Sequence, residues 1–291
     1  MPALIFDCDG VLIDTEQGGH LRAFNEMWRE FGVPWQWSPA QYAAKLKISG
    51  GKERLRSLRH DVDFRTVWDV PTSPSAWEQT VAAWHRRKTE IFLDIVRSGG
   101  VTPRPGVRRL AEEAAKAGWS LAIASASAQR SVQAVLKHVM GNELACRFTV
   151  LSGESVAAKK PAPDVYELAA RAIDAKPSDC VVVEDSRNGL VAALAAGMTC
   201  VVTPTELSRS EDFSGAALVI TCLGEPAAEQ GSVLANPHGV PVADHVDLGH
   251  LRQLLQTAQM YRTALHPLPH SNRPPTDTSR RAPSAVRTTD S

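Results

Sequence analysis

The sequence predicts an α/β protein: a Rossmann-like parallel sheet interrupted by an inserted, all-helical cap. Short apolar, β-branched runs alternate with helix-like segments over residues 1–14 and 100–265. Strands that are apolar throughout are typical of parallel sheets covered on both faces. Residues 15–99 contain only segments with helical periodicity. We therefore expect a catalytic core formed by residues 1–14 and 100–265 and a substrate-selecting cap formed by residues 15–99.

The first strand is the apolar run that starts at Ala3 and ends at Asp7. Leu21, Phe24 and Trp28 then recur at helical spacing and predict a cap helix over residues 15–32. Further cap helices are expected over residues 39–47, around Leu55 and Leu58, and, after a turn rich in Pro and Ser at residues 71–75, over residues 76–96.

The core resumes with a helix over residues 107–117, which Gly118 ends as a C-terminal capping glycine. Core strands are expected over residues 120–124, 148–151, 180–183, 199–202 and 217–220. Core helices are expected over residues 129–140, 164–173, 189–196 and 248–265. Residues 266–291 carry almost no large apolar side chain, so we predict a disordered tail there.

The composition excludes several classes of protein. The 32 basic and 32 acidic residues balance, which argues against a nucleic-acid surface. No apolar run reaches the roughly 18–20 residues of a membrane span, and the N-terminus lacks the pattern of a signal peptide. The five cysteines form no CxxC pair, so we expect them to be reduced and buried in a cytoplasmic protein.

Polar side chains gather where the predicted strands end. Asp7 and Asp9 close the first strand, and Glu184 and Asp185 close another. Ser125 ends a third strand, and Lys160 lies in the loop after a fourth. The carboxyl ends of parallel strands meet at one edge, where ligands bind.

Each of these residues has a plainer interpretation when it is taken alone. Ser125 could cap a helix, Lys160 could be a solvated loop lysine, and Glu184 and Asp185 could cap the next helix. The shared edge favours a single site instead. Carboxylate oxygens suit Mg²⁺, and a lysine, a hydroxyl and backbone amides suit a phosphoryl group. A carboxylate there can act as a nucleophile and a second one can move protons.

These motifs, read in order, resemble those of the haloacid dehalogenase superfamily: residues 7–11, 124–127, 160–164 and 184–189. The resemblance implies that Asp7 is the nucleophile and Asp9 the general acid/base, which also offers Mg²⁺ its backbone carbonyl. It implies a phosphate site at Ser125, the Ala126 amide and Lys160. The metal site would comprise Asp7, Asp9, Glu184 and Asp185. An aspartate at position 9 fits phosphatases and phosphomutases rather than dehalogenases.

The helical insertion is similar to the cap of CbbY-type members, which include xylulose-1,5-bisphosphate phosphatases. The similarity lies in residues 20–25, 50–54 and 85–90 and in Tyr42. The segment before His20 is one residue longer than the family pattern. The resemblance implies that the cap contacts substrate through Glu16, His20, Tyr42, Gly51, Lys52, Arg54 and Lys88.

The cap composition supports a second anion site independently of the resemblance. Gly51 leaves a backbone amide accessible, and Lys52, Arg54 and Lys88 bring positive charge. The alternative is a solvated helix face, which we favour for Arg86. Trp28, Trp77 and Trp84 are expected in the cap core rather than as a stacking platform for sugar.

The sequence therefore predicts a Mg²⁺-dependent phosphatase that acts on a small sugar phosphate, such as the ketose bisphosphate xylulose 1,5-bisphosphate. A β-phosphoglucomutase-like isomerase with the same catalytic set is the alternative. A non-enzymatic sensor of a phosphorylated ligand is a further alternative, disfavoured because Asp7 and Lys160 are both present. We expect a monomer or weak homo-oligomer that engages neither nucleic acid nor membrane.

Overall fold

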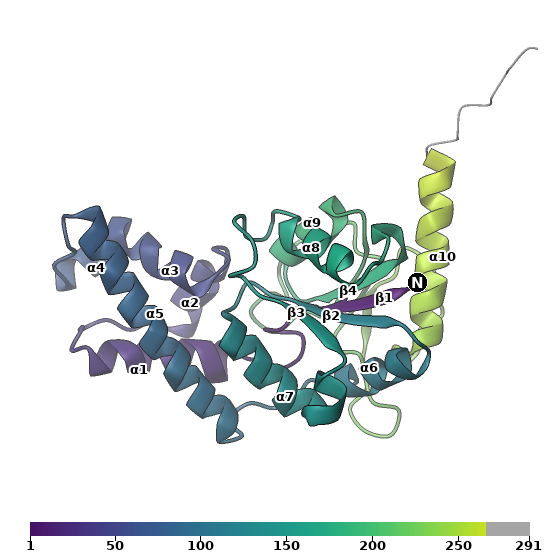
Figure 1. Ribbon diagram of the computed structural model, residues 1–291, viewed down its shortest axis with the longest axis horizontal. Helices are drawn as coiled ribbons and strands as arrows, with labels where there is room; N and C mark the ends of the chain where they lie inside the picture. Colours follow the sequence, from purple (N-terminus) through teal and green to yellow (C-terminus); the bar gives the residue numbers. More distant parts are fainter. Residues whose placement is uncertain (266–291) are drawn as a thin grey trace, which may run out of the picture.

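The computed structural model describes residues 1–265, which form a seven-stranded sheet flanked by helices and a separate group of helices (Figure 1). The strand order is β3-β2-β1-β4-β5-β6-β7. The strands are β1 (Ala3–Phe6), β2 (Ser120–Ala124), β3 (Phe148–Leu151), β4 (Cys180–Glu184), β5 (Thr199–Val202), β6 (Leu218–Ile220) and β7 (Val233–Ala235). The first six pair in parallel, which confirms the predicted sheet, and β7 pairs antiparallel with β6. The sequence did not predict β7, because its three residues are all exposed and carry no alternation.

Each face of the sheet has its own hydrophobic core because side chains alternate along a strand. Leu4 and Phe6 pack on one face, and Ala3 and Ile5 pack on the other. The first face is covered by α6 (Val107–Lys116), α7 (Gln129–Ala145) and α10 (Leu248–Leu265). The second face is covered by α8 (Asp164–Ala172) and α9 (Arg187–Ala195), seen above the sheet in Figure 1. Helix α7 extends past its predicted end, across a break at Gly141.

The segment between β1 and α6 is helical, as predicted. It contains a π-helical turn (Glu16–Leu21), α1 (Arg22–Glu30), α2 (Pro39–Leu46), α3 (Gly51–Ser57), a 3₁₀ turn (Leu58–His60), α4 (Val62–Val67) and α5 (Pro74–Arg97). The six-residue α4 was not predicted, because it is too short to show periodicity. The Asp61 carboxylate caps it by accepting a hydrogen bond from the Phe64 amide at 3.2 Å.

An aromatic core fills this helical segment. Trp28, Trp77 and Trp84 are buried, which confirms their prediction as core residues. Trp37 joins them, with its ring 4.7 Å from that of Trp28, and Trp35 packs edge-on against Phe64 at 5.3 Å. The segment meets the rest of the protein along α5, which lies beside α7 (Figure 1).

The two backbone segments through which the chain leaves the sheet and returns to it pair with each other. Ile13 forms an antiparallel bridge with Pro103, and the Arg104 amide donates to the Leu12 carbonyl at 2.9 Å. The outgoing segment at Ile13 and the returning segment at Pro103 therefore lie side by side. The outgoing segment directly follows the loop that carries Asp9.

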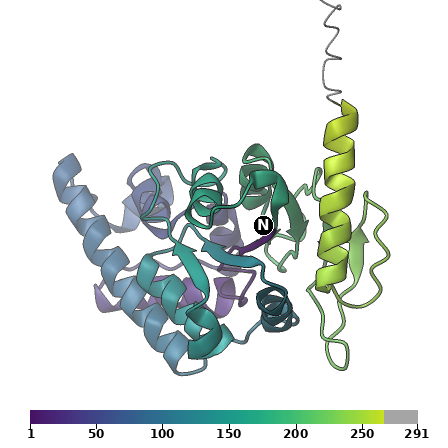
Figure 2. The ribbon, with the colours of Figure 1, turned by 45° about the vertical axis from the view of Figure 1, so that its right-hand side comes forward.

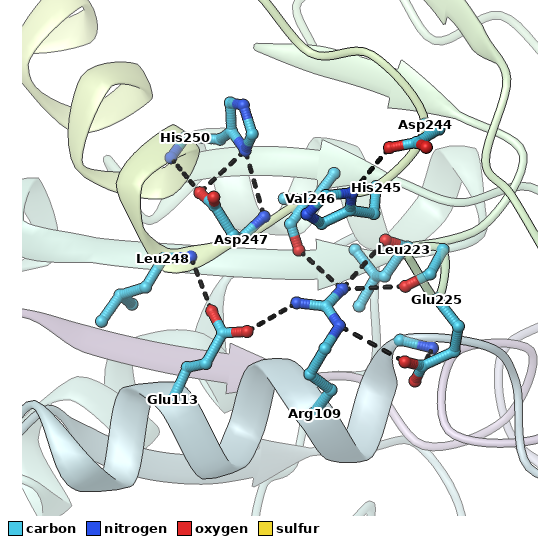
Figure 3. A network of polar contacts seen from close by, with 12 residues as sticks. Arg109, Glu113, Leu223, Glu225, Asp244, His245, Val246, Asp247, Leu248 and His250 are labelled. Atoms are coloured by element: carbon cyan, nitrogen blue, oxygen red, sulfur yellow. Dashed lines mark hydrogen bonds and ion pairs between the residues drawn. The ribbon is translucent and has the colours of Figure 1, made fainter. Parts of the chain in front are cut away.

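Helix α6 anchors the C-terminal segment through Arg109 and Glu113 (Figure 3). The Arg109 guanidinium donates to the carbonyls of Leu223 (3.3 Å), Gly224 (2.8 Å) and Val246 (3.0 Å). Glu113 accepts from the amide of Leu248, the first residue of α10, at 3.0 Å. Helix α10 consequently lies along the side of the sheet (Figure 2).

All five cysteines are free, and four of them are buried as predicted. The prediction was wrong for Cys146, which is exposed because it follows the end of α7 and lies outside any strand. Among residues 1–265, no helix has the length and apolar character needed to cross a membrane. The predicted disordered tail, residues 266–291, lies outside the described residues.

Candidate active site

The central strands bring the predicted strand-end residues together. Phe6 of β1 is level with Ile123 of β2 and Val183 of β4, so the residues that follow these three strands share one edge. The Asp7 amide donates to the Val183 carbonyl at 3.0 Å. Asp7 and Ser125 both line one cavity at this edge.

Lys160 joins the two acidic strand ends. Its ammonium group lies 2.6 Å from Asp7 Oδ1, 2.6 Å from Glu184 Oε1 and 2.9 Å from the Ala124 carbonyl. The side chain is buried, so the interpretation as a solvated loop lysine does not hold. Burial alone would lower the pKa of Lys160, but the two carboxylates outweigh it and raise that pKa.

Asp7, Glu184 and Asp185 form a buried acidic cluster with ligand oxygens within 4.8 Å of one another. Burial raises the pKa of Asp7 to about 8, with Lys160 opposing and Glu184 and Asp9 adding to the rise. Burial and the same neighbouring acids raise the pKa of Asp185 well above its usual value. Three buried carboxylates against one lysine leave a negative excess that a divalent cation would neutralise. Hard oxygen donors of this kind fit Mg²⁺.

Two glycines allow this cluster to form. A Cβ at Gly10, which has φ +78°, would lie 2.1 Å from an oxygen of Asp185. A Cβ at Gly189 would lie 1.9 Å from the Glu184 carboxylate. Side chains at these positions would occupy the space of the acids themselves, so both motifs require glycine here.

Asp9 faces a different environment from Asp7. Its carboxylate accepts hydrogen bonds from Thr15 Oγ1 at 2.9 Å, from His20 Nε2 at 2.8 Å and from the Ser127 hydroxyl. Burial would raise the pKa of Asp9, but these donors, His20 first, lower it below its usual range. The side chain of Asp9 lies outside the three-carboxylate cluster. Asp7 and Asp9, separated by one residue, therefore differ in protonation. The surroundings favour the protonated form of Asp7 and the ionised form of Asp9.

Lys88 sets the orientation of His20. The Lys88 ammonium lies 2.8 Å from His20 Nδ1 and can only donate hydrogen bonds. His20 Nδ1 must then accept, which leaves the ring proton on Nε2 to donate to Asp9. Burial lowers the pKa of Lys88 to about 8. Lys88, His20 and Asp9 thus form a chain of hydrogen bonds from α5 to the sheet edge.

A π-helical turn accommodates the extra residue before His20. The His20 amide donates to the Thr15 carbonyl at 2.6 Å, five residues back rather than four. A π turn holds one more residue than an α turn. The sequence predicted an ordinary helix over residues 15–32, and the first turn differs for this reason.

Glu16, Tyr42 and Arg54 form a second polar group on the helical side. Glu16 accepts from the Tyr42 hydroxyl at 2.7 Å, and Arg54 donates to the same hydroxyl oxygen at 3.1 Å. Glu16 and Arg54 line the cavity, whereas Tyr42 is fully buried behind them. Burial and the Glu16 carboxylate raise the pKa of Tyr42, which keeps the hydroxyl protonated.

The cavity between the helical segment and the sheet edge has a volume of about 90 Å³. Ligand sites usually measure about 300–1,000 Å³, so the space between the two sides is small. The predicted site residues that line it are Asp7, Asp9, Glu16, His20, Gly51, Arg54, Lys88, Ser125, Ala126, Lys160 and Asp185.

Three predicted site residues do not line this cavity: Tyr42 and Glu184, which are fully buried, and Lys52. Lys52 lines a neighbouring groove with Arg56 and Lys159 instead. Gly51 and Arg54 are three residues apart on α3 and share a face, and Lys52 is turned about 100° away from Gly51. Lys52 makes no hydrogen bond or ion pair with the described part of the chain.

Several residues that line the cavity were not predicted from the sequence. Ser127 lies within a recognised motif, but only its contact with Asp9 reveals a role for the second hydroxyl. Thr205, Ser208 and Glu211 reach the cavity from the loop after β5. That loop lacks periodicity, so no sequence signal indicated where it would fold.

Comparison with known proteins agrees with this geometry. The family model described as haloacid dehalogenase-like hydrolase matches residues 1–197. This chain belongs to the haloacid dehalogenase-like hydrolase family. The predicted resemblance is thereby confirmed.

Individual relatives place the chain within this hydrolase family. It is 41% identical to the protein CbbY of Cupriavidus necator, over 87% of this chain and 96% of the relative. A crystal structure of CbbY from Rhodobacter sphaeroides in complex with phosphate has a TM-score of 0.69 at 39% identity, covering 76% of this chain and 95% of that one. A mutant of that protein in complex with xylulose-(1,5)bisphosphate matches equally. The chain is a CbbY-like phosphatase of the family.

Proposed function

We propose that this hydrolase removes phosphate from a small sugar phosphate, with a ketose bisphosphate such as xylulose 1,5-bisphosphate as the preferred substrate. One observation carries the proposal: the buried Asp7–Lys160 pair and Asp185 share a cavity with the cationic side chains of Arg54 and Lys88. The Rhodobacter sphaeroides relative, crystallised with xylulose-(1,5)bisphosphate, supports this substrate class. The free cysteines support a reducing compartment such as the cytoplasm.

In the first step, an Asp7 carboxylate oxygen attacks the phosphorus atom, and the bond from phosphorus to the sugar oxygen breaks. Asp9 donates a proton to that oxygen, and an aspartyl-phosphate remains on Asp7. Lys160, the Ser125 hydroxyl and the Ala126 amide bind the phosphoryl oxygens. Asp7, Glu184 and Asp185 would hold Mg²⁺, which would supply positive charge to offset the carboxylates and the phosphate.

In the second step, water attacks the aspartyl-phosphate and Asp9 accepts its proton. The three donors to Asp9 stabilise its ionised form and suit this base role. For the first step Asp9 must carry a proton, which the negative charge of a bound substrate favours. Inorganic phosphate then leaves, and Asp7 is restored.

Release of inorganic phosphate across pentulose and hexose mono- and bisphosphates, with and without EDTA, tests the proposal. We expect a ketose bisphosphate to give the highest kcat/KM and EDTA to abolish turnover. Absence of phosphate release from every sugar phosphate would overturn the proposal and favour a sensor. The small volume of the cavity also suits a mutase, which must exclude water. Interconversion of hexose 1- and 6-phosphates without phosphate release would establish that alternative.

A further inference from the structure

Arg104 is a half-buried residue that the proposed mechanism does not use. It lies where the chain returns from the helical segment to the sheet domain. Its guanidinium donates to four backbone carbonyls, those of Gly10, Thr203 (2.6 Å), Pro204 (3.2 Å) and Thr221 (2.6 Å). These acceptors belong to the loops after β1, β5 and β6. One side chain therefore crosslinks three loops at the edge that carries the active site.

No carboxylate pairs with this guanidinium among the described residues. Burial lowers the pKa of Arg104, and the more distant acids Asp185 and Asp14 oppose that change. A planar guanidinium offers five donors in a fixed fork, whereas an ammonium group is a compact point charge. The acceptor set thus requires arginine for its geometry rather than for a salt bridge.

Two of the crosslinked loops position the acidic cluster. Gly10 follows Asp9 and packs against the Asp185 carboxylate so closely that no Cβ would fit. Thr203 donates its amide to the Glu184 carbonyl at 2.7 Å. Arg104 holds the carbonyls of both Gly10 and Thr203, and so it fixes the loop after β1 relative to the end of β4.

We propose that Arg104 is a positioning residue for the metal-binding carboxylates Asp7, Glu184 and Asp185. The inference rests on the metal site of the proposed function. Loss of the crosslink lets the loop after β1 move relative to β4 and separates the three carboxylates. Residues that orient metal ligands typically change metal affinity by about 10–100-fold when they are replaced, and we expect Arg104→Met to weaken metal binding by that factor.

Arg109 provides a matched control on the same stretch of chain. Its guanidinium also donates to three backbone carbonyls, but these lie in the C-terminal segment and none belongs to a loop that carries a cluster acid (Figure 3). Arg109→Met therefore removes a comparable set of carbonyl contacts, together with the ion pairs to Glu113 and Glu225, and leaves the loops after β1 and β5 untouched. A general loosening of the fold would affect both variants alike.

Calorimetric titration of Mg²⁺ and of Mn²⁺ into the full-length wild type, Arg104→Met, Arg104→Lys and Arg109→Met tests the inference below the onset of thermal unfolding. We expect both Arg104 variants to bind metal at least about tenfold more weakly and Arg109→Met to stay within about twofold of wild type. Wild-type affinity in the Arg104 variants, or equal weakening in Arg109→Met, would overturn it. If Arg104→Met does not fold, Arg104→Lys decides by the same comparison. A wild type that binds no metal would instead overturn the proposed metal site, and this inference with it.

Discussion

The two walls of the cavity are held in place by different interactions. The sheet wall carries Asp7 and Lys160 on the loops after β1 and β3, and strand register places both beside Glu184 at the end of β4. The helical wall carries Lys88 and Arg54 on separate helices held by aromatic packing. Charges on the sheet wall are paired with one another. The Lys88 charge, by contrast, contacts no carboxylate directly: it lies against His20 Nδ1 and over the rings of Phe24 and Phe92. The comparison teaches that strand register positions the sheet wall, whereas side-chain packing positions the helical wall.

The largest effect is expected from Asp7→Asn, which removes the nucleophile that we propose on the sheet wall. We expect phosphate release to fall by about 10⁴-fold or more, with the fold retained because Asn is isosteric. Single-turnover phosphate release and circular dichroism measure the two properties. Appreciable multiple turnover by this variant would refute the covalent mechanism.

Lys160→Met is expected to have the next largest effect. Removing the cation leaves Asp7 and Glu184 without their shared partner, and loss of one such donor costs about 10²–10³-fold in kcat. Lys159→Met is the matched control, because the neighbouring lysine contacts only the Gly153 carbonyl among the described residues. Equal losses of kcat in the two variants would contradict the role of Lys160.

Lys88→Met tests the helical wall, where we expect activity and stability to change in opposite directions. The chain of hydrogen bonds to Asp9 is broken, so kcat/KM should fall by about 10–100-fold. Stability should rise, because a pKa lowered from 10.5 to about 8 corresponds to about 3 kcal/mol of penalty for the buried charge.

The pH dependence gives the sign of the Lys88 effect. The penalty is fully present below pH 8, diminishes as the pH rises towards 10.5, and vanishes above it. The stability difference between Lys88→Met and wild type should therefore be largest near pH 7. Denaturant unfolding across this range measures it, with exposed Arg86→Met on the same helix as the control. A difference that grows with pH would contradict the assignment.

Trp84→Ala should change activity least, because it alters the packing behind the helical wall and no cavity residue. Loss of this buried indole should destabilise the protein by about 3–5 kcal/mol. Phe31→Ala, which removes a partly exposed ring that contacts Trp84, should cost under about 1 kcal/mol. Metal affinity of the folded protein should stay within about twofold of wild type, and a larger loss would mean that the two walls are not independent.

The sheet wall could be predicted from sequence because residues that follow neighbouring parallel strands lie at the same edge of the sheet. Ser125 and Lys160 follow recognisable strands, and parallel register brings them to the same edge as Asp7. The fold was predictable for the same reason, except at short elements without periodicity such as β7.

The helical wall was predictable only in part. Gly51, Lys52 and Arg54 all look equally suitable in sequence, and only the rotation of α3 separates Lys52 from the other two. Arg104 gave no signal, because it binds backbone carbonyls, which every residue type possesses. Long-range contacts of this kind depend on tertiary structure rather than on any local pattern.

The two carbonyl-binding arginines also tie the segment that matches the family model to the chain that follows it. The family model matches residues 1–197, but three of the four carbonyls bound by Arg104 lie at residues 203, 204 and 221. The three carbonyls bound by Arg109 lie later still. A polypeptide shortened to the family match would keep both arginines and lose most of their acceptors. The chain that supplies these acceptors therefore extends to Val246, well past the segment that matches the family model.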